Sequence, residues 1–140
     1  MVEELCSLRN PISSGLQLWF KADALELPSD SPVSAWTDSS GNGRVAQQPD
    51  PTKQPTYRTE GVNGQPYVRF NGSDQFMELT FSPFFNSEEF AIFTVAKHSA
   101  TGGDLPILSS IEGTTGGGDA AGYSLIYDAS NGDAQANWRE

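Results

Sequence analysis

The sequence has few of the residues that carry redox, metal-binding or nucleophilic chemistry. Its 140 residues include one cysteine, Cys6, and one histidine, His98. A single cysteine excludes an internal disulfide and any thiolate cluster for zinc or iron–sulfur binding, so stability must come from packing. No serine nucleophile motif accompanies His98, which we expect to be a surface residue.

Basic residues and long apolar runs are also scarce. Eight Lys and Arg stand against eighteen Asp and Glu, and the formal net charge is −10. Without a basic block the chain is not expected to bind nucleic acid or an anionic membrane surface. No stretch approaches the roughly 20 apolar residues of a membrane span, and the acidic Glu3 and Glu4 lie where a secretion signal is basic. We therefore expect neither a membrane span nor a secretion signal.

Paired catalytic carboxylates are missing as well. Glycoside hydrolysis needs two carboxyl groups facing one cleft, but Glu88 and Glu89 are adjacent and would point to opposite faces of a strand. The glycine-rich stretch at 113–122 lacks the Gly-Lys-Ser/Thr ending that cradles phosphates. The sequence therefore predicts a protein that is not an enzyme.

Turn-forming residues and short β-type runs are abundant. The chain has 14 glycines, 9 prolines and four Asn-Gly dipeptides, which favour tight reversals. Runs rich in β-branched and aromatic residues predict strands at 16–20, 67–70, 76–81, 90–97, 107–111 and 123–127. The run at 90–96 is apolar on both faces, as in an inner strand of stacked sheets. We expect an all-β fold of at least seven antiparallel strands in two sheets, with these residues in the core: Leu18, Phe20, Trp36, Phe70, Phe93 and Val95.

A series of motifs resembles one known family. The matching stretches are 15–24 (GLQLWFKADA), 33–43 (VSAWTDSSGNG), 55–57 (PTY), 63–66 (NGQP) and 68–74 (VRFNGSD). In this order they resemble the laminin-G-like branch of the concanavalin A-like jelly rolls. The resemblance implies an antiparallel two-sheet jelly-roll sandwich.

The resemblance also suggests how the chain is organised. It implies a jelly-roll domain at 15–140, preceded by an N-terminal arm at 1–14. Domains of this family usually run well beyond 140 residues, so the last strands are expected to be missing here. Either the sequence is part of a longer chain, or a partner covers the open sheet edges.

The segment at 38–43 has a pattern that suits either a turn or a cation. Oxygen-bearing Asp38, Ser40 and Asn42 alternate before Gly43, as in the first half of a calcium loop, but the twelfth position is Pro49 and not glutamate. Asp38 and Asn42 are therefore expected to bond their own turn, and no cofactor is expected. Because some laminin-G-like domains bind calcium at a sheet rim, calcium at Asp38 and Asn42 stays an alternative.

Several aromatic residues are candidates for stacking on sugar rings. They are Trp19, Tyr123, Tyr127 and Trp138, whose flat faces match the C–H face of a pyranose. Packing inside the sandwich is the alternative role for each of them, and we assign Trp36 to the core.

The N-terminal arm is the candidate surface for protein partners. Val2, Leu5, Cys6 and Leu8 form an apolar strip on a short helical pattern at 2–9, which is either a frayed terminus or an arm that docks on a neighbour. We expect a homo-oligomer or a larger assembly.

These observations favour a non-enzymatic structural or binding module of a phage particle. A capsid decoration protein or a tail-fibre component fits the resemblance, the missing secretion signal, the missing disulfides and the missing catalytic set. Its location would be the virion, assembled in the host cytoplasm. The alternatives are a carbohydrate-binding or adhesion module of a bacterial surface protein, located outside the cell, and part of a glycosidase whose acids lie beyond Glu140.

Overall fold

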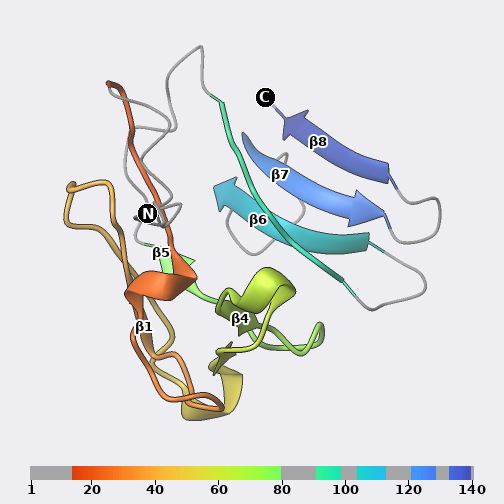
Figure 1. Cartoon of the computed structure of the whole chain (residues 1–140). Helices are drawn as coiled ribbons and strands as arrows, with labels where there is room; N and C mark the ends of the chain where they lie inside the picture. The colour runs from red at the N-terminus through yellow and green to blue at the C-terminus, as the bar shows by residue number, and fades with distance from the viewer. Residues whose placement is uncertain (1–13, 80–90, 99–103, 113–120, 129–132, 140) are drawn as a thin grey trace. The chain divides into compact units, whose positions relative to one another are not determined.

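The computed structural model describes residues 14–79, 91–98, 104–112, 121–128 and 133–139 (Figure 1). The chain divides into two compact units, Met1–Phe90 and Ala91–Glu140. The described elements are antiparallel strands and short 3-10 turns, which is consistent with the predicted all-β class. The finer prediction of a jelly-roll sandwich stays a prediction. No helix in the described part of the chain has the length and apolar character of a membrane span.

The first unit contains two small sheets. Its elements in chain order are η1 (Ala22–Ala24), β1 (Ala35–Thr37), β2 (Val45–Gln47), η2 (Pro51–Lys53), β3 (Thr56–Arg58), η3 (Val62–Gly64), β4 (Tyr67–Arg69) and β5 (Glu78–Leu79). Strands β1, β2 and β5 form one antiparallel sheet in that order, and β3 pairs with β4. The register places Trp36 opposite Ala46 and Tyr57 opposite Val68.

Two of the three reversals predicted at Asn-Gly in this unit are confirmed. Asn42-Gly43 lies in the connection between antiparallel β1 and β2, and Gly43 has a φ of 71°. Asn63-Gly64 lies in η3 between β3 and β4, where Asn63 also has a positive φ of 56°. Asparagine and glycine tolerate this left-handed backbone better than other residues. The fourth dipeptide, Asn131-Gly132, lies outside the described residues.

The buried apolar side chains of the first unit lie in β2, in β3 and in the chain beside β3. Val33, Ala46 and Tyr57 are its buried hydrophobic side chains, and Pro55 is fully buried. The chain before β1 runs beside β3, because the Val33 amide donates to the Pro55 carbonyl and the Tyr57 amide donates to the Ser31 carbonyl, both at 2.8 Å. The core therefore forms where a connecting segment completes the β3 edge.

The predicted core differs from this one. Phe70 is 43% exposed, Phe93 is 81% exposed and Val95 is fully exposed, so their assignment to the core is wrong. Phe70 lies one residue beyond the end of β4, beside the turn at Asn71-Gly72. Phe93 and Val95 belong to residues 91–98, which lie in none of the described strand ladders.

The other three predicted core residues are half-buried: Leu18, Phe20 and Trp36. The Phe20 and Trp36 rings pack together with centroids 5.3 Å apart, and Trp36 Nε1 donates to the Lys21 carbonyl at 2.9 Å. In a strand as short as β1, only the central residue is turned inward. The pair therefore closes a small local cluster.

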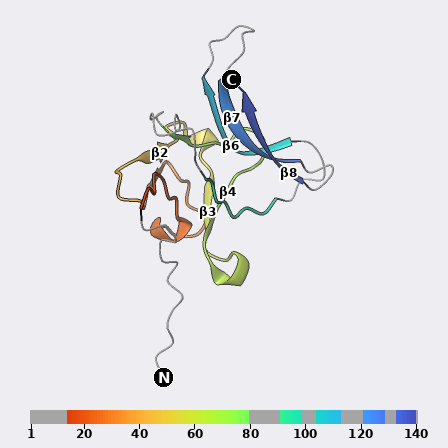
Figure 2. The same ribbon diagram turned by 90° about the horizontal axis from the view of Figure 1, so that it is seen from above.

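The described residues of the second unit include one antiparallel sheet. Its strands are β6 (Asp104–Glu112), β7 (Ala121–Asp128) and β8 (Asp133–Arg139), in the order β6-β7-β8 (Figure 2). The β6–β7 ladder shifts register between Pro106 and Leu108, whereas β7 and β8 pair without interruption.

The predicted strands are confirmed at 67–70, 107–111 and 123–127, which overlap β4, β6 and β7, and in part at 76–81, which contains β5. Those at 16–20 and 90–97 are not formed in the described residues. The backbone at 16–19 bonds mainly to side chains instead of to a neighbouring strand, as the site geometry shows.

Candidate functional site

The Asp38 carboxylate joins two segments that are far apart in the sequence. Asp38 is only 6% exposed. Its Oδ1 accepts hydrogen bonds from the Trp19 amide at 2.7 Å and from the Ser40 amide at 2.9 Å, and its Oδ2 accepts from the Ser40 hydroxyl. The Ser39 amide donates in turn to the Trp19 carbonyl at 2.8 Å. One carboxylate thus fixes both the turn after β1 and the backbone at Trp19.

Two further side chains from the same turn hold the same segment. Asn42 Nδ2 donates to the Leu16 carbonyl at 3.1 Å and to the Gln17 carbonyl at 3.0 Å. The Arg44 guanidinium donates to the Gln17 carbonyl as well. We call residues 38–44 with 16–19 the clasp, because side chains of the turn satisfy backbone groups that a strand partner would otherwise take.

The contacts of the clasp fix the protonation state of Asp38. Burial raises the pKa of the Asp38 carboxyl, but the hydrogen bonds from Ser40 and Trp19 and the charge of Arg44 outweigh burial and lower it. The carboxylate therefore stays ionised well into the acidic range.

The prediction that Asp38 and Asn42 bond their own turn is confirmed by their contacts with Ser40. Both carboxylate oxygens of Asp38 already accept hydrogen bonds from protein groups. Among the described residues, no three His, Cys, Asp or Glu side chains are grouped so as to hold a metal ion. The hydrogen bonds of the clasp hold the turn after β1 against the segment at 16–19.

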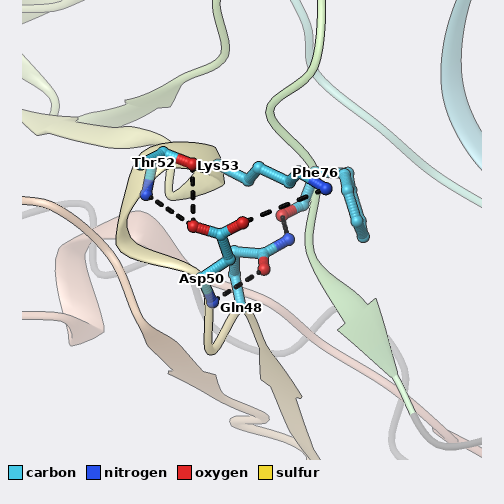
Figure 3. A network of polar contacts seen from close by, with 5 residues as sticks. All are labelled: Gln48, Asp50, Thr52, Lys53 and Phe76. Atoms are coloured by element: carbon cyan, nitrogen blue, oxygen red, sulfur yellow. Dashed lines mark hydrogen bonds and ion pairs between the residues drawn. The ribbon is translucent and has the colours of Figure 1, made fainter.

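A second polar network lies around Gln48, which is only 2% exposed (Figure 3). Gln48 Nε2 donates to the Phe76 carbonyl at 3.1 Å, and its Oε1 accepts from the Asp50 amide at 3.1 Å. Asp50 caps η2 by accepting from the Thr52 amide and hydroxyl at 3.0 and 2.7 Å, and these hydrogen bonds lower the pKa of the Asp50 carboxyl. The network ties η2 to the chain before β5.

A polar hollow with one aromatic wall lies at the end of the β3–β4 pair. Its volume is about 460 Å³, and its lining residues are Ser29, Asp30, Arg58, Thr59, Glu60 and Tyr67. Arg58 and Tyr67 face each other in the register, and Arg58 Nη1 lies 2.6 Å from Asp30 Oδ1. Two carboxylates against one guanidinium make the lining net negative, which disfavours anionic ligands.

Gly61 allows the aromatic wall of this hollow to form. A Cβ at Gly61 would lie 2.4 Å from the Gln65 carbonyl oxygen and 2.8 Å from Tyr67 Cδ1. Both distances are shorter than real contacts, so any larger residue would push Tyr67 away. Sequence reasoning missed this hollow because the register that brings Arg58 to Tyr67 is not visible in local patterns.

The four predicted sugar-stacking residues are divided between the two units. Trp19 lies in the first unit, where it is half-buried and the Lys21 ammonium lies 5.1 Å from its ring centroid. Tyr123 and Tyr127 lie in β7, and Trp138 lies in β8. The register places Tyr123 opposite Trp138 and Tyr127 opposite Ala134.

Among the described residues, the two most exposed large apolar side chains, Phe93 and Val95, belong to residues 91–98 (AIFTVAKH), which we call the 91–98 segment. All eight residues are exposed, and the large apolar ones are Ile92, Phe93 and Val95. The segment belongs to no strand ladder among the described residues. Sequence patterning found these residues, but assigned them to the interior.

The predicted partner-binding residues Val2, Leu5, Cys6 and Leu8 lie outside the described residues. Comparisons of the chain with protein-family models, with curated proteins and with solved structures gave no match. The resemblance to the laminin-G-like family therefore stays a prediction from the sequence motifs.

Proposed function

We propose that this chain is a non-enzymatic structural module that works by associating with other protein surfaces. The observation that carries the proposal is the 91–98 segment, with Phe93 and Val95 displayed to solvent. Covering a large apolar side chain contributes about 1.5 to 3 kcal/mol before the cost of association, so a row of them favours a protein contact.

The setting we propose is a phage particle, as a capsid decoration protein or a tail-fibre component located in the virion. The support is the sequence resemblance to a family that occurs in virion proteins, together with the apolar surface that a repeated assembly contact requires. Protein partners, a second copy of the chain among them, are the expected ligands.

Light scattering of the intact chain tests this function. We expect a mass above the 15.1 kDa of one chain, and a return toward that mass in the Phe93→Ser/Val95→Ser variant. Phe70→Ser is the matched control, because Phe70 is also an exposed aromatic residue but lies in the first unit. A wild-type protein that stays monomeric at its highest soluble concentration would contradict the proposal.

The hollow beside Tyr67 favours a second candidate function, the binding of a neutral glycan. Tyr67 offers a partly exposed ring, while Asp30, Glu60 and Arg58 offer acceptors and donors for hydroxyl groups. A glycan array followed by titration calorimetry tests it. We expect Tyr67→Ala to weaken any binding about tenfold, which equals about 1.4 kcal/mol, and Phe70→Ala to leave it unchanged.

A further inference from the structure

We propose that the 91–98 segment of one copy adds as a further strand to β8 of a second copy, at the β8 edge that has no partner among the described residues. The inference rests on the proposed function and names its partner and its geometry. Strand addition of this kind is a common mode of protein association, because main-chain hydrogen bonds provide the contact and the side chains choose the partner.

The 91–98 segment has the properties of a strand that lacks a ladder. In Figure 1 it runs as an elongated stretch, and it pairs with none of the described strands of its own chain. Apolar and polar residues do not alternate regularly along the segment, so both of its faces would be apolar in a strand. Such a strand favours burial on both faces of a sheet. It contains no glycine or proline, and β-branched Ile92, Thr94 and Val95 suit a pleated ladder.

The edge of β8 suits such an addition better than the edge of β6. Each of these strands has one ladder partner, β7, among the described residues. Strand β6 contains Pro106, which has no N–H, and its ladder shifts register between Pro106 and Leu108. Bulges and prolines are devices that protect an edge from pairing. Strand β8 has no proline, and all seven of its residues pair regularly with β7.

Charge selects the antiparallel direction. In an antiparallel pairing over the full length of β8, Lys97 lies opposite Asp133, Thr94 opposite Ala136, and Ile92 opposite Trp138. In a parallel pairing over the same span, Lys97 would lie opposite Arg139. Opposite charges across a strand pair are favourable and like charges are unfavourable, so the antiparallel register is preferred.

The partner we propose is a second copy, because one chain contains both elements of the contact, the 91–98 segment and the edge of β8. The 91–98 segment has one cation and no acidic residue, whereas the whole chain carries a net charge of −10. The segment of each copy can therefore pair with β8 of the other around a two-fold axis, which gives a closed and self-complementary contact.

Cross-linking between separately prepared variants tests the pairing in trans. Cys6→Ser serves as the background, and Thr94→Cys and Ala136→Cys are made as two different proteins. After mixing and mild oxidation, we expect a disulfide between positions 94 and 136, identified by mass spectrometry of the digested dimer. Ser109→Cys on β6 replaces Ala136→Cys in the matched control, and we expect at least about tenfold less cross-linking there.

The outcomes separate this inference from the proposed function. An assembled protein without the 94–136 cross-link, or with equal cross-linking to position 109, overturns the β8 contact but leaves the function in place. A monomer without cross-links overturns both. A cross-link found only inside the monomeric Thr94→Cys/Ala136→Cys double variant shows pairing within one chain and overturns the second copy as partner.

A charge exchange tests the register independently. Lys97→Glu and Asp133→Lys should each weaken assembly, because each places like charges opposite one another. The combined Lys97→Glu/Asp133→Lys protein should regain assembly. Loss of assembly in the combined protein as well would overturn the antiparallel register.

Discussion

Asp38 shows how a single buried carboxylate organises a segment that has no strand partner. It accepts three hydrogen bonds from Trp19 and Ser40, while Asn42 and Arg44 hold the neighbouring carbonyls at 16–17. The sequence predicts the turn contacts of Asp38 and Asn42, because side chains of Asp and Asn bond locally in turns. It does not predict the partner segment at 16–19, since a contact across about twenty residues leaves no local pattern.

The clasp makes the free energy of unfolding depend on pH in the acidic range. Because the folded-state pKa of Asp38 is lowered from its usual 3.8, the carboxylate contributes stability that is fully present above pH 3.8 and is lost as the pH falls through the lower folded value. Urea unfolding at pH 7 and pH 3 measures this loss. Asp38→Asn should lower the free energy of unfolding at pH 7 by about 1 to 3 kcal/mol. The variant should also show a weaker dependence of this free energy on pH in the acidic range. An equally steep profile in the variant would contradict the role of Asp38.

The same carboxylate makes a prediction about calcium. Since both oxygens of Asp38 already accept hydrogen bonds, EDTA should leave the melting temperature unchanged. Differential scanning calorimetry with EDTA and with added calcium is the measurement. A calcium-dependent rise of several degrees that disappears in Asp38→Ala would establish a metal site in the clasp.

At the scale of elements, the short strands of the first unit bury at most one residue each. Patterning finds β4, β6 and β7 because they are rich in β-branched and aromatic residues. It does not find β8, whose sequence DAQANWR is mostly polar and small, and which is placed by its regular pairing with β7. Patterning also wrongly predicts a buried strand at 90–97. An apolar run indicates that a segment favours burial, but it does not show that another layer of the fold covers the segment.

Trp36 provides a test of the local cluster around β1. Trp36→Ala should lower the free energy of unfolding by about 2 to 4 kcal/mol, because the ring packs on Phe20 and donates a hydrogen bond to the Lys21 carbonyl. The loss should be smaller than for a fully buried tryptophan, because the ring is only half-buried. Trp36→Phe keeps an aromatic ring and removes the hydrogen bond, so it should cost about 1 kcal/mol. Chemical denaturation measures both, and a loss below about 0.5 kcal/mol in the free energy of unfolding of Trp36→Ala would refute the cluster.

Gly61 tests the connection between β3 and β4. Gly61→Ala should destabilise the first unit by about 1 to 3 kcal/mol, because the new methyl group meets the Gln65 carbonyl and the Tyr67 ring. Val62→Ala is the neighbouring control, since Val62 is exposed and its truncation should change little. Equal melting temperatures for Gly61→Ala and the wild type would show that Tyr67 does not rest on Gly61.

At the scale of the whole molecule, the chain consists of two units with different means of stabilisation. The first unit relies on small sheets whose connecting segments are held by buried polar groups such as Asp38 and Gln48. The second has longer strands in one sheet, whose β7–β8 ladder is uninterrupted, and a displayed apolar segment. Composition predicts the all-β class correctly, because turn residues and β-type runs are local properties. The stacking of sheets depends on contacts between distant segments, and the predicted jelly roll stays a prediction.

Hydrogen exchange of the 91–98 segment tests the central claim, association through this surface, most directly. The backbone amides of the segment should exchange slowly at high protein concentration and quickly after dilution, because their ladder partner belongs to a second copy. Strand β7, which has a partner on both sides within its own chain, should stay protected at both concentrations. Rapid exchange of the 91–98 segment at every concentration, with β7 protected throughout, would contradict the claim.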